Sequence, residues 1–283
     1  MPSPRSRSNP GPHSGVDAAA SLRDVAGLAF DLDGTIYLGP ALLPGALALL
    51  EALAAAGVPY LFATNNSSKT GEQYLERLLE LRLPVQRAQL LTSNDVAVTH
   101  LQREGLRRPY LLATPDVEDE YRAQGIEPTA SDPDSVLLTF DTTLTYEKLR
   151  VASDLIRSGL PYLATHPDLV CPTPTGPIPD CGAFIALLAE ATGVRPLVLG
   201  KPRGSMAAAI SARVGLPPER IAYVGDRLYT DVRMANEHGF RAVLTLTGET
   251  QREDLAGSPH APDIVVDTLE VLHEQLRRAG VSR

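Results

Sequence analysis

The sequence predicts an α/β fold in which helices cover a mostly parallel sheet, and three observations support this class. Short apolar runs alternate with helical patterns from Val25 onward, and this alternation is the repeating unit of a parallel sheet. The chain has 283 residues, enough for one large domain or for two without disulfide staples. A middle segment, residues 97–195, has a different texture and carries strand and helix units of its own.

The elements before this segment alternate between strand and helix. Three apolar runs have the length of buried strands: residues 27–30, 58–64 and 88–93. Two stretches between them have helical patterns: residues 44–57 and 70–82. Pro44 near the start of the first helix and Gly57 after its end are typical of those positions.

The elements after the middle segment repeat this alternation. Four further strands are predicted: residues 195–200, 220–226, 240–248 and 263–269. Two helices are predicted among them: residues 205–215 and 230–239. Because the two groups are alike, we expect residues 22–96 and 196–283 to form two parts of one domain.

The middle segment is predicted to form a second α/β domain, residues 97–195. Its strands are predicted at residues 109–114, 135–140 and 161–165. Its helices are predicted at residues 117–125, 146–159 and 183–193. The stretch 166–182 is dense in proline and glycine, and a loop of this length inside a domain is usually functional or mobile.

Composition excludes several classes of protein. Residues 1–21 are rich in Pro, Ser, Gly and Arg and lack the apolar core of a signal peptide, so we expect a disordered tail. The formal net charge of −8 argues against a nucleic-acid partner. The most apolar stretch, residues 41–63, is interrupted by Pro, Gly and Glu, so no membrane span is expected. Cys171 and Cys181 lack metal-binding spacing and are predicted to be free thiols of a cytoplasmic protein.

Two carboxylates follow the first buried strand in the run DLDGT. Asp31 and Asp33 lie on one side of an extended backbone, and Gly34 permits the turn after them. They are placed at the carboxyl end of a parallel strand, where open α/β sheets bind ligands, and paired carboxylates suit Mg²⁺. A solvated turn is the simpler alternative. A calcium loop does not fit, because Ile36 and Leu42 stand where its glycine and its bidentate glutamate belong.

Polar side chains also follow three other predicted strands. Thr64 and Asn65 offer a hydroxyl and backbone amides ahead of a helix, an arrangement that holds phosphate. Lys201 follows another strand, and Asp226 with Asp231 follows a third. Ordinary turn and cap chemistry would explain each of these positions alone. Together they predict one site for a metal ion and a phosphate group.

This combination resembles the haloacid dehalogenase (HAD) superfamily of aspartate-nucleophile phosphatases. The four motifs match as DLDGT, the TN of ATNNS, the lysine of GKP, and GDRLYTD. The runs TNNSSKT, TYEKL and LGKP, with an insertion between the second and third motifs, resemble the NagD-type subfamily, class IIA. The resemblance implies a Rossmann-like parallel-sheet core and an inserted α/β cap domain of the C2 type.

The resemblance implies a Mg²⁺-dependent phosphatase that acts on a small phosphorylated substrate. Asp31 would attack phosphorus, and Asp33 would protonate the leaving oxygen and later activate water. Asp31, the backbone carbonyl of Asp33, and Asp226 would hold Mg²⁺, and Asp231 would ligate it directly or through water. Thr64, Asn65 and Lys201 are the implied phosphate-binding residues. The candidate substrate contacts in the cap are Asp141, His166, Asp168 and Asp180, and such acids would disfavour a highly anionic substrate.

Two other functions remain open from the sequence. A phosphotransferase or phosphomutase on the same core would differ only in the group that accepts the phosphoryl. A binding protein on a phosphatase scaffold would have lost catalysis, although every motif residue is retained here. A signalling receiver domain is disfavoured because it needs neither the second acid nor an insertion. The sequence is compatible with a homodimer formed through the cap.

Overall fold

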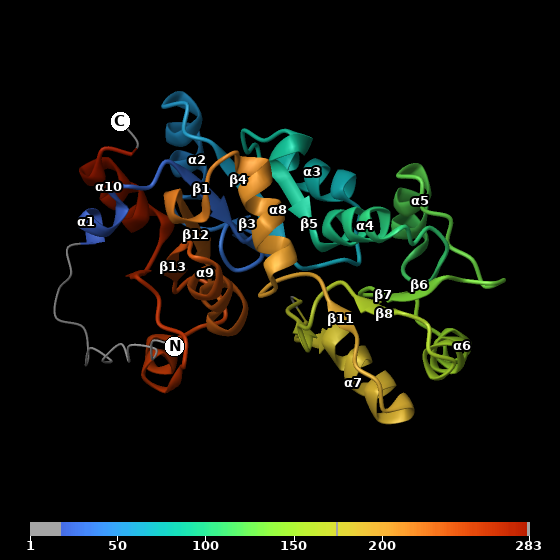
Figure 1. Cartoon of the computed structure of the whole chain (residues 1–283). Helices are drawn as coiled ribbons and strands as arrows, with labels where there is room; N and C mark the ends of the chain where they lie inside the picture. The colour runs from blue at the N-terminus through green and yellow to red at the C-terminus, as the bar shows by residue number, and fades with distance from the viewer. Residues whose placement is uncertain (1–17, 174, 282–283) are drawn as a thin grey trace, which may run out of the picture.

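The computed structural model describes residues 18–173 and 175–281. Its larger sheet, called the core sheet below, has six parallel strands in the order β14-β13-β12-β1-β4-β5. Their bounds are β1 Gly27–Phe30, β4 Tyr60–Thr64, β5 Leu90–Thr92, β12 Ile221–Gly225, β13 Arg241–Thr245 and β14 Ile264–Val266. Strand β1 lies inside the sheet between β12 and β4 (Figure 1). The predicted parallel α/β core is confirmed.

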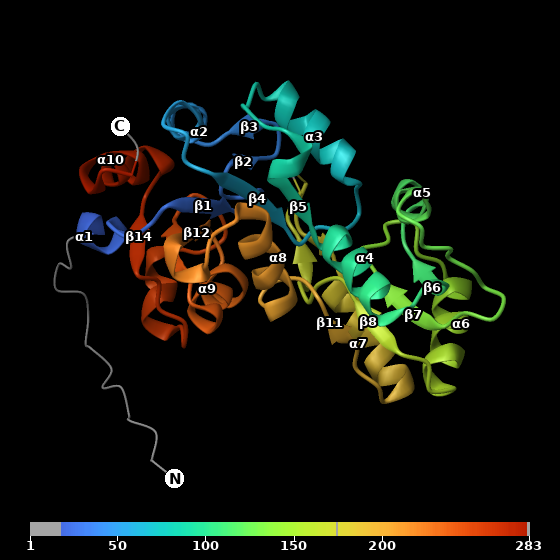
Figure 2. The same ribbon diagram turned by 45° about the horizontal axis from the view of Figure 1, so that its top comes forward.

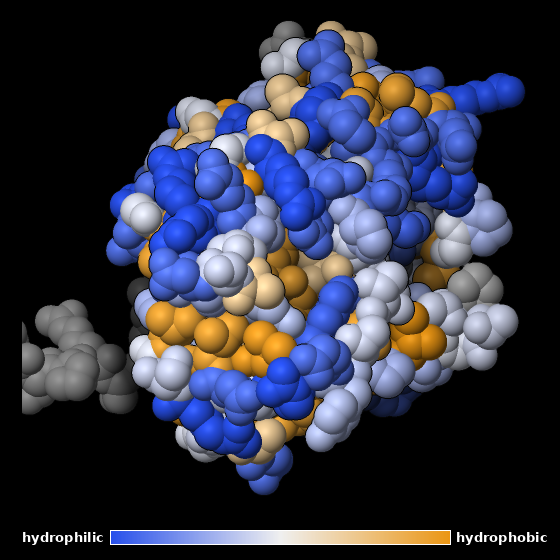
Figure 3. All heavy atoms as spheres, turned by 90° about the vertical axis from the view of Figure 1, so that its right-hand side faces the viewer, coloured by the Kyte–Doolittle hydropathy of each residue, from blue (hydrophilic) through white to orange (hydrophobic). Residues whose placement is uncertain are grey.

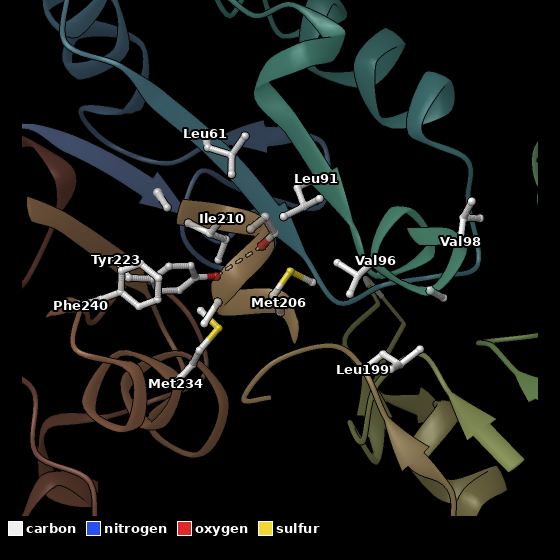
Figure 4. Close-up of a cluster of buried hydrophobic side chains, with 14 of the residues drawn as sticks. Leu61, Leu91, Val96, Val98, Leu199, Met206, Ile210, Tyr223, Met234 and Phe240 are labelled. Atoms are coloured by element: carbon white, nitrogen blue, oxygen red, sulfur yellow. Dashed lines mark hydrogen bonds between the residues drawn. The ribbon is translucent and has the colours of Figure 1, made fainter. Parts of the chain in front are cut away.

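Helices cover both faces of the core sheet (Figures 1 and 2). Their bounds are α1 Ala18–Leu22, α2 Ala46–Ala55, α3 Gly71–Glu80, α4 Ser93–Glu104, α8 Gly204–Val214, α9 Arg233–His238 and α10 Leu269–Ala279. Successive strand side chains point to opposite faces, so Leu61 and Phe62 of β4 belong to different apolar clusters. In the cluster of Leu61, the rings of Tyr223 and Phe240 lie close to Met234 (Figure 4). Each face of the sheet is therefore a packed core.

The smaller sheet, called the cap sheet, has four parallel strands in the order β11-β8-β7-β6. Its strands are β6 Pro109–Leu112, β7 Ser135–Leu138, β8 Tyr162–Ala164 and β11 Leu197–Val198. Its helices are α5 Pro115–Ala123, α6 Tyr146–Arg157 and α7 Cys181–Thr192. It lies beside the core sheet, below α4 and α8 in the view of Figure 1.

Short elements complete the described chain. Two hairpins are formed by β2 Tyr37–Leu38 with β3 Ala41–Leu42, and by β9 Val170–Cys171 with β10 Ile178–Pro179. Three 3-10 turns are η1 Arg87–Gln89, η2 Pro218–Arg220 and η4 Arg252–Gly257. A π-helical turn, η3 Leu228–Val232, precedes α9. The second hairpin lies in the long stretch 166–182, which is therefore partly ordered by strand pairing.

The structure differs from the sequence prediction at two places. The run 195–200 was expected in the core, but its strand β11 pairs with β8 of the cap sheet. Residues 18–21 were expected in a disordered tail, but they belong to α1, whose Leu22 is fully buried. Helix α1 is held by packing on α10, which a short helical sequence does not reveal by itself. Residues 1–17 of the predicted tail lie outside the described residues, and the boundaries at residues 97 and 196 remain predictions.

The described surface is mostly hydrophilic on the cap side (Figure 3), and both cysteines are free. Seen from the cap side, hydrophilic residues predominate and hydrophobic ones gather in separate patches (Figure 3). Across residues 18–173 and 175–281, no helix combines the length and apolarity needed to cross a bilayer. Cys171 and Cys181 are both free thiols, as predicted.

The packing of α1 is tested by Leu22→Ala. We expect the free energy of unfolding to fall by about 2–5 kcal/mol, because the side chain is fully buried. Leu79→Ala is the control, since Leu79 is 51% exposed on α3, and its effect should stay within about 0.5 kcal/mol. Urea unfolding measures both variants. Equal unfolding midpoints for Leu22→Ala and the wild type would show that α1 is not part of the cooperative fold.

Candidate active site

The site lies where three neighbouring strands of the core sheet end. Strand β1 leads into Asp31 and Asp33, β4 ends at Thr64, and β12 leads into Asp226. These strands are adjacent and parallel in the order β12-β1-β4, so their carboxyl ends meet at one edge. Asp31, Thr64 and Asp226 are all buried there. The structure thus brings together the first, second and fourth motifs.

Lys201 reaches this edge from the cap sheet. It follows β11, and its Nζ lies 2.5 Å from Asp31 Oδ1 and 2.8 Å from Asp231 Oδ1. Only 3% of Lys201 is exposed. Burial alone would lower the pKa of Lys201, but Asp231 and Asp31 raise it well above its ordinary value. The ammonium therefore stays charged at neutral pH and joins the two carboxylates.

Three carboxylates form a compact acidic cluster. One oxygen from each of Asp31, Asp226 and Asp231 lies within 4.8 Å of the others, and all three residues are buried. Burial raises the pKa of Asp31 to about 7, although Lys201 opposes this shift. Burial, together with Asp31 and Asp231, also raises the pKa of Asp226. A cation among these oxygens would stabilise their charged forms against both burial and mutual repulsion.

The backbone around Asp226 holds its carboxylate in the acidic cluster. Its Oδ2 accepts a hydrogen bond of 2.7 Å from the Glu249 backbone N–H. Its Oδ1 is buried and has no hydrogen-bond partner among the described residues. A Cβ on Gly34 would lie 2.5 Å from Asp226 Oδ2, and one on Gly248 would lie 2.0 Å from it. The two glycines leave the space that this carboxylate occupies, and its free oxygen fits a metal ligand.

Asp231 is fully buried and points inward. Its Oδ1 accepts from Lys201, and its Oδ2 accepts a 3.1 Å bond from the Arg227 backbone N–H. The π-helical turn of residues 228–232 gives it this direction. Both oxygens of Asp231 already accept a hydrogen bond. Asp231 is therefore better suited to contact a metal through water than to be its main direct ligand.

Asp33 stands between two cavities. It lines a small cavity at Asp31 and also a larger one of about 530 Å³. Its Oδ2 accepts a long hydrogen bond of 3.4 Å from the Tyr37 hydroxyl. Burial raises the pKa of Asp33, with Lys69 and Arg227 opposing the shift. A carboxyl in this place can hold a proton next to the larger cavity.

Thr64, the last residue of β4, and Asn65 after it have different surroundings. Thr64 Oγ1 accepts a hydrogen bond of 3.2 Å from the Asn66 backbone N–H and lines the small cavity. The Asn65 side chain instead bonds to the backbone of Lys201 and to Asp168. Its amide is therefore already occupied, and the phosphate contact predicted for Asn65 would have to come from its backbone.

The four candidate cap residues divide into three kinds. Asp168 and Asp180 line the small cavity at Asp31, at the carboxyl ends of the core strands. His166 is fully buried behind them, with Nε2 2.9 Å from Asp180 Oδ1. Asp141 does not reach the site, because its carboxylate is buried against Lys148 Nζ at 2.5 Å. The prediction that His166 and Asp141 contact substrate is therefore not supported by their positions.

Sequence reasoning missed two residues of this region. Arg227 has Nη1 3.4 Å from Asp168 Oδ2 and Nε 2.9 Å from Glu249 Oε2, so it joins the core to the cap. Lys69 lines the larger cavity, and its charge opposes the rise in the pKa of Asp33. The signal for both was present, since Arg227 lies inside GDRLYTD and Lys69 inside TNNSSKT.

Comparison with known proteins agrees with this geometry. The haloacid dehalogenase-like hydrolase model matches residues 28–127, and the HAD-hydrolase-like model matches residues 198–272. An acid sugar phosphatase of Staphylococcus aureus is 30% identical over 227 residues, 80% of this chain and 88% of that protein. The chain belongs to the haloacid dehalogenase-like hydrolases. Within this superfamily it is of the NagD type, class IIA.

Two further HAD proteins show how far the likeness extends. A 4-nitrophenylphosphatase structure from Thermotoga maritima has a TM-score of 0.87 and 41% identity, covering 90% of this chain and 98% of that one. A 5'-nucleotidase of Bacillus subtilis is 29% identical over 249 residues, 88% of this chain and 97% of that protein. The chain is thus a HAD phosphatase, and these relatives bear names that refer to different phosphoesters.

The space that Gly248 leaves for the Asp226 carboxylate is tested by Gly248→Ala. We expect phosphatase activity to fall by about tenfold or more, because the new Cβ displaces the carboxylate, and tenfold corresponds to about 1.4 kcal/mol. Gly257→Ala is a matched control, since a Cβ there meets nothing within 4 Å and neither glycine has a positive φ. Steady-state kinetics measures both variants. Full activity of folded Gly248→Ala would contradict the account of Asp226.

Proposed function

We propose that this chain is a Mg²⁺-dependent phosphomonoesterase that forms a phosphoryl intermediate on Asp31. The observation that carries the proposal is the Lys201 ammonium 2.5 Å from Asp31 Oδ1, beside a cluster of buried acids. A buried cation favours the ionised form of a neighbouring carboxylate and fixes its direction, as a nucleophile requires.

The acidic cluster fits Mg²⁺ by the chemistry of its donors. Magnesium takes one or two carboxylates and keeps water and substrate oxygens for its other positions. Asp31 and Asp226 would hold it, with the backbone carbonyl of Asp33, and Asp231 would complete the site directly or through water. When bound, the ion supplies the positive charge that lets a carboxylate approach a phosphate dianion.

The two acids of DLDGT divide the reaction into two displacements. In the first, an Asp31 oxygen bonds to phosphorus and the ester P–O bond breaks. The electron pair of the broken bond stays on the leaving oxygen, and this oxygen takes a proton from Asp33. In the second, Asp33 takes a proton from water, the water oxygen bonds to phosphorus, and the Asp31–phosphorus bond breaks. Thr64 and Lys201 hold the phosphoryl oxygens during both steps.

The larger cavity is proposed to hold the leaving group. It begins at Asp33 and has a volume of about 530 Å³, which suits a ring-sized group. Aromatic side chains form part of its wall: Tyr37, Tyr74 and Phe140. Lys69 and Arg77 also line it, and Asp33 is its one acidic residue within the described chain. The cap acids Asp168 and Asp180 line the small cavity instead, so they do not disfavour an anionic leaving group.

The proposed reaction is tested by Mg²⁺-dependent phosphate release from a panel of phosphomonoesters. We expect the rate of phosphate release by Asp31→Asn to be at least about 10³-fold lower than that of the wild type, because an amide is a poor nucleophile. Removal of the metal with a chelator should also stop the reaction. No release from any ester by the folded, metal-loaded wild type would contradict the proposal and favour a transferase or a binding protein.

The charge in the leaving-group cavity is tested by Lys69→Met with two matched esters, phenyl phosphate and 4-carboxyphenyl phosphate. We expect KM for the carboxylated ester to rise about fivefold, since a partly exposed ion pair contributes about 1 kcal/mol. KM for phenyl phosphate is the internal control and should change less than about twofold. An equal change for both esters would show that Lys69 does not recognise an anionic substituent.

A further inference from the structure

The Asn65 side chain holds the backbone of Lys201 on both sides. Asn65 Oδ1 accepts a 2.8 Å hydrogen bond from the Lys201 N–H, and Asn65 Nδ2 donates to the Lys201 carbonyl at 3.1 Å. Asn65 and Lys201 are both buried, with 4% and 3% exposed. These bonds fix the peptide from which the Lys201 side chain extends toward Asp31.

Asp168 reinforces the orientation that the Lys201 backbone gives to the Asn65 amide. Asn65 Nδ2 also donates to Asp168, at 3.2 Å from Oδ2 and 3.4 Å from Oδ1. An ionised carboxylate accepts hydrogen bonds and donates none, so only the amide nitrogen can face it. The oxygen of the amide must then face the Lys201 N–H. The exchanged orientation would place two acceptors together and two donors together.

The surroundings leave this arrangement little freedom. A Cβ on Gly200 would lie 2.6 Å from Asn65 Oδ1, so the amide packs directly on the backbone before Lys201. Asp168 is 4% exposed and lies 3.4 Å from Arg227 Nη1, which balances its charge. Both oxygens of Asp168 already have partners, which favours an indirect role for Asp168 over contact with substrate.

We propose that Asp168 is a positioning residue of the cap that acts through Asn65 on Lys201. Asp168 follows β8 of the cap sheet, whereas Asn65 follows β4 of the core sheet. By holding the amide, Asp168 helps to keep the lysine in its productive place at Asp31. The cap thereby contributes to the phosphoryl site as well as to the leaving-group cavity. This inference rests on the proposed phosphatase function.

The test compares Asp168→Ala with Asp141→Ala. Both residues are buried aspartates of the cap that pair with a cation, but Asp141 lines neither the cavity at Asp31 nor the leaving-group cavity. We expect kcat of Asp168→Ala to fall at least about tenfold while KM changes less than about threefold. Asp141→Ala should keep kcat within about threefold, whatever it loses in thermal stability. Equal kcat in Asp168→Ala and the wild type would overturn the proposal.

A double-mutant cycle separates positioning from direct contact. If Asp168 acts through Asn65, Asp168→Ala should reduce kcat by less than about twofold in a chain that already carries Asn65→Ala. Multiplication of the two separate losses would overturn the proposal and assign Asp168 to the substrate.

A crystal structure of Asp168→Ala is a readout that does not need the reaction. We expect Lys201 Nζ to leave Asp31 Oδ1, and an unchanged pair with an unchanged Asn65 would overturn the proposal. Absence of activity in the wild type would instead count against the phosphatase function itself.

Discussion

The Lys201 ammonium between Asp31 and Asp231 is the interaction on which the rest of the site depends. All three groups are buried, where an unpaired charge would be costly. The lysine opposes the rise that burial causes in the pKa of Asp31, and it fixes one of the Asp31 oxygens. The second oxygen of Asp31 is thereby left for a metal or for phosphorus.

This arrangement needs both sheets of the molecule. The core sheet supplies Asp31, Thr64 and Asp226 from the ends of adjacent strands, whereas Lys201 follows a strand that pairs with the cap sheet. Arg227 joins the two units through Asp168. Because groups of the proposed site come from both sides of the junction, a change in the position of the cap would alter the proposed phosphoryl site as well as access to it.

Much of this site was predictable from the sequence, because its residues lie at strand ends. Asp31, Thr64 and Asp226 follow apolar runs that parallel-sheet logic places side by side. The sequence could not predict that β11 pairs with the cap sheet, because the run 195–200 has the same apolar pattern as the core strands. The pairing of Asn65 with Lys201 spans 136 positions in the chain, and no local pattern records such a contact. Helix α1 depends on α10 in the same way.

The most direct test of the account is to find the phosphoryl group on the protein. Wild-type protein with Mg²⁺ and substrate would be quenched in acid during the first turnover, digested and mapped by mass spectrometry. The account predicts one phosphoryl group on the peptide that contains Asp31, labile to hydroxylamine as an acyl phosphate is. Rapid turnover with no covalent phosphoryl group, or a phosphoryl group on another residue, would contradict it.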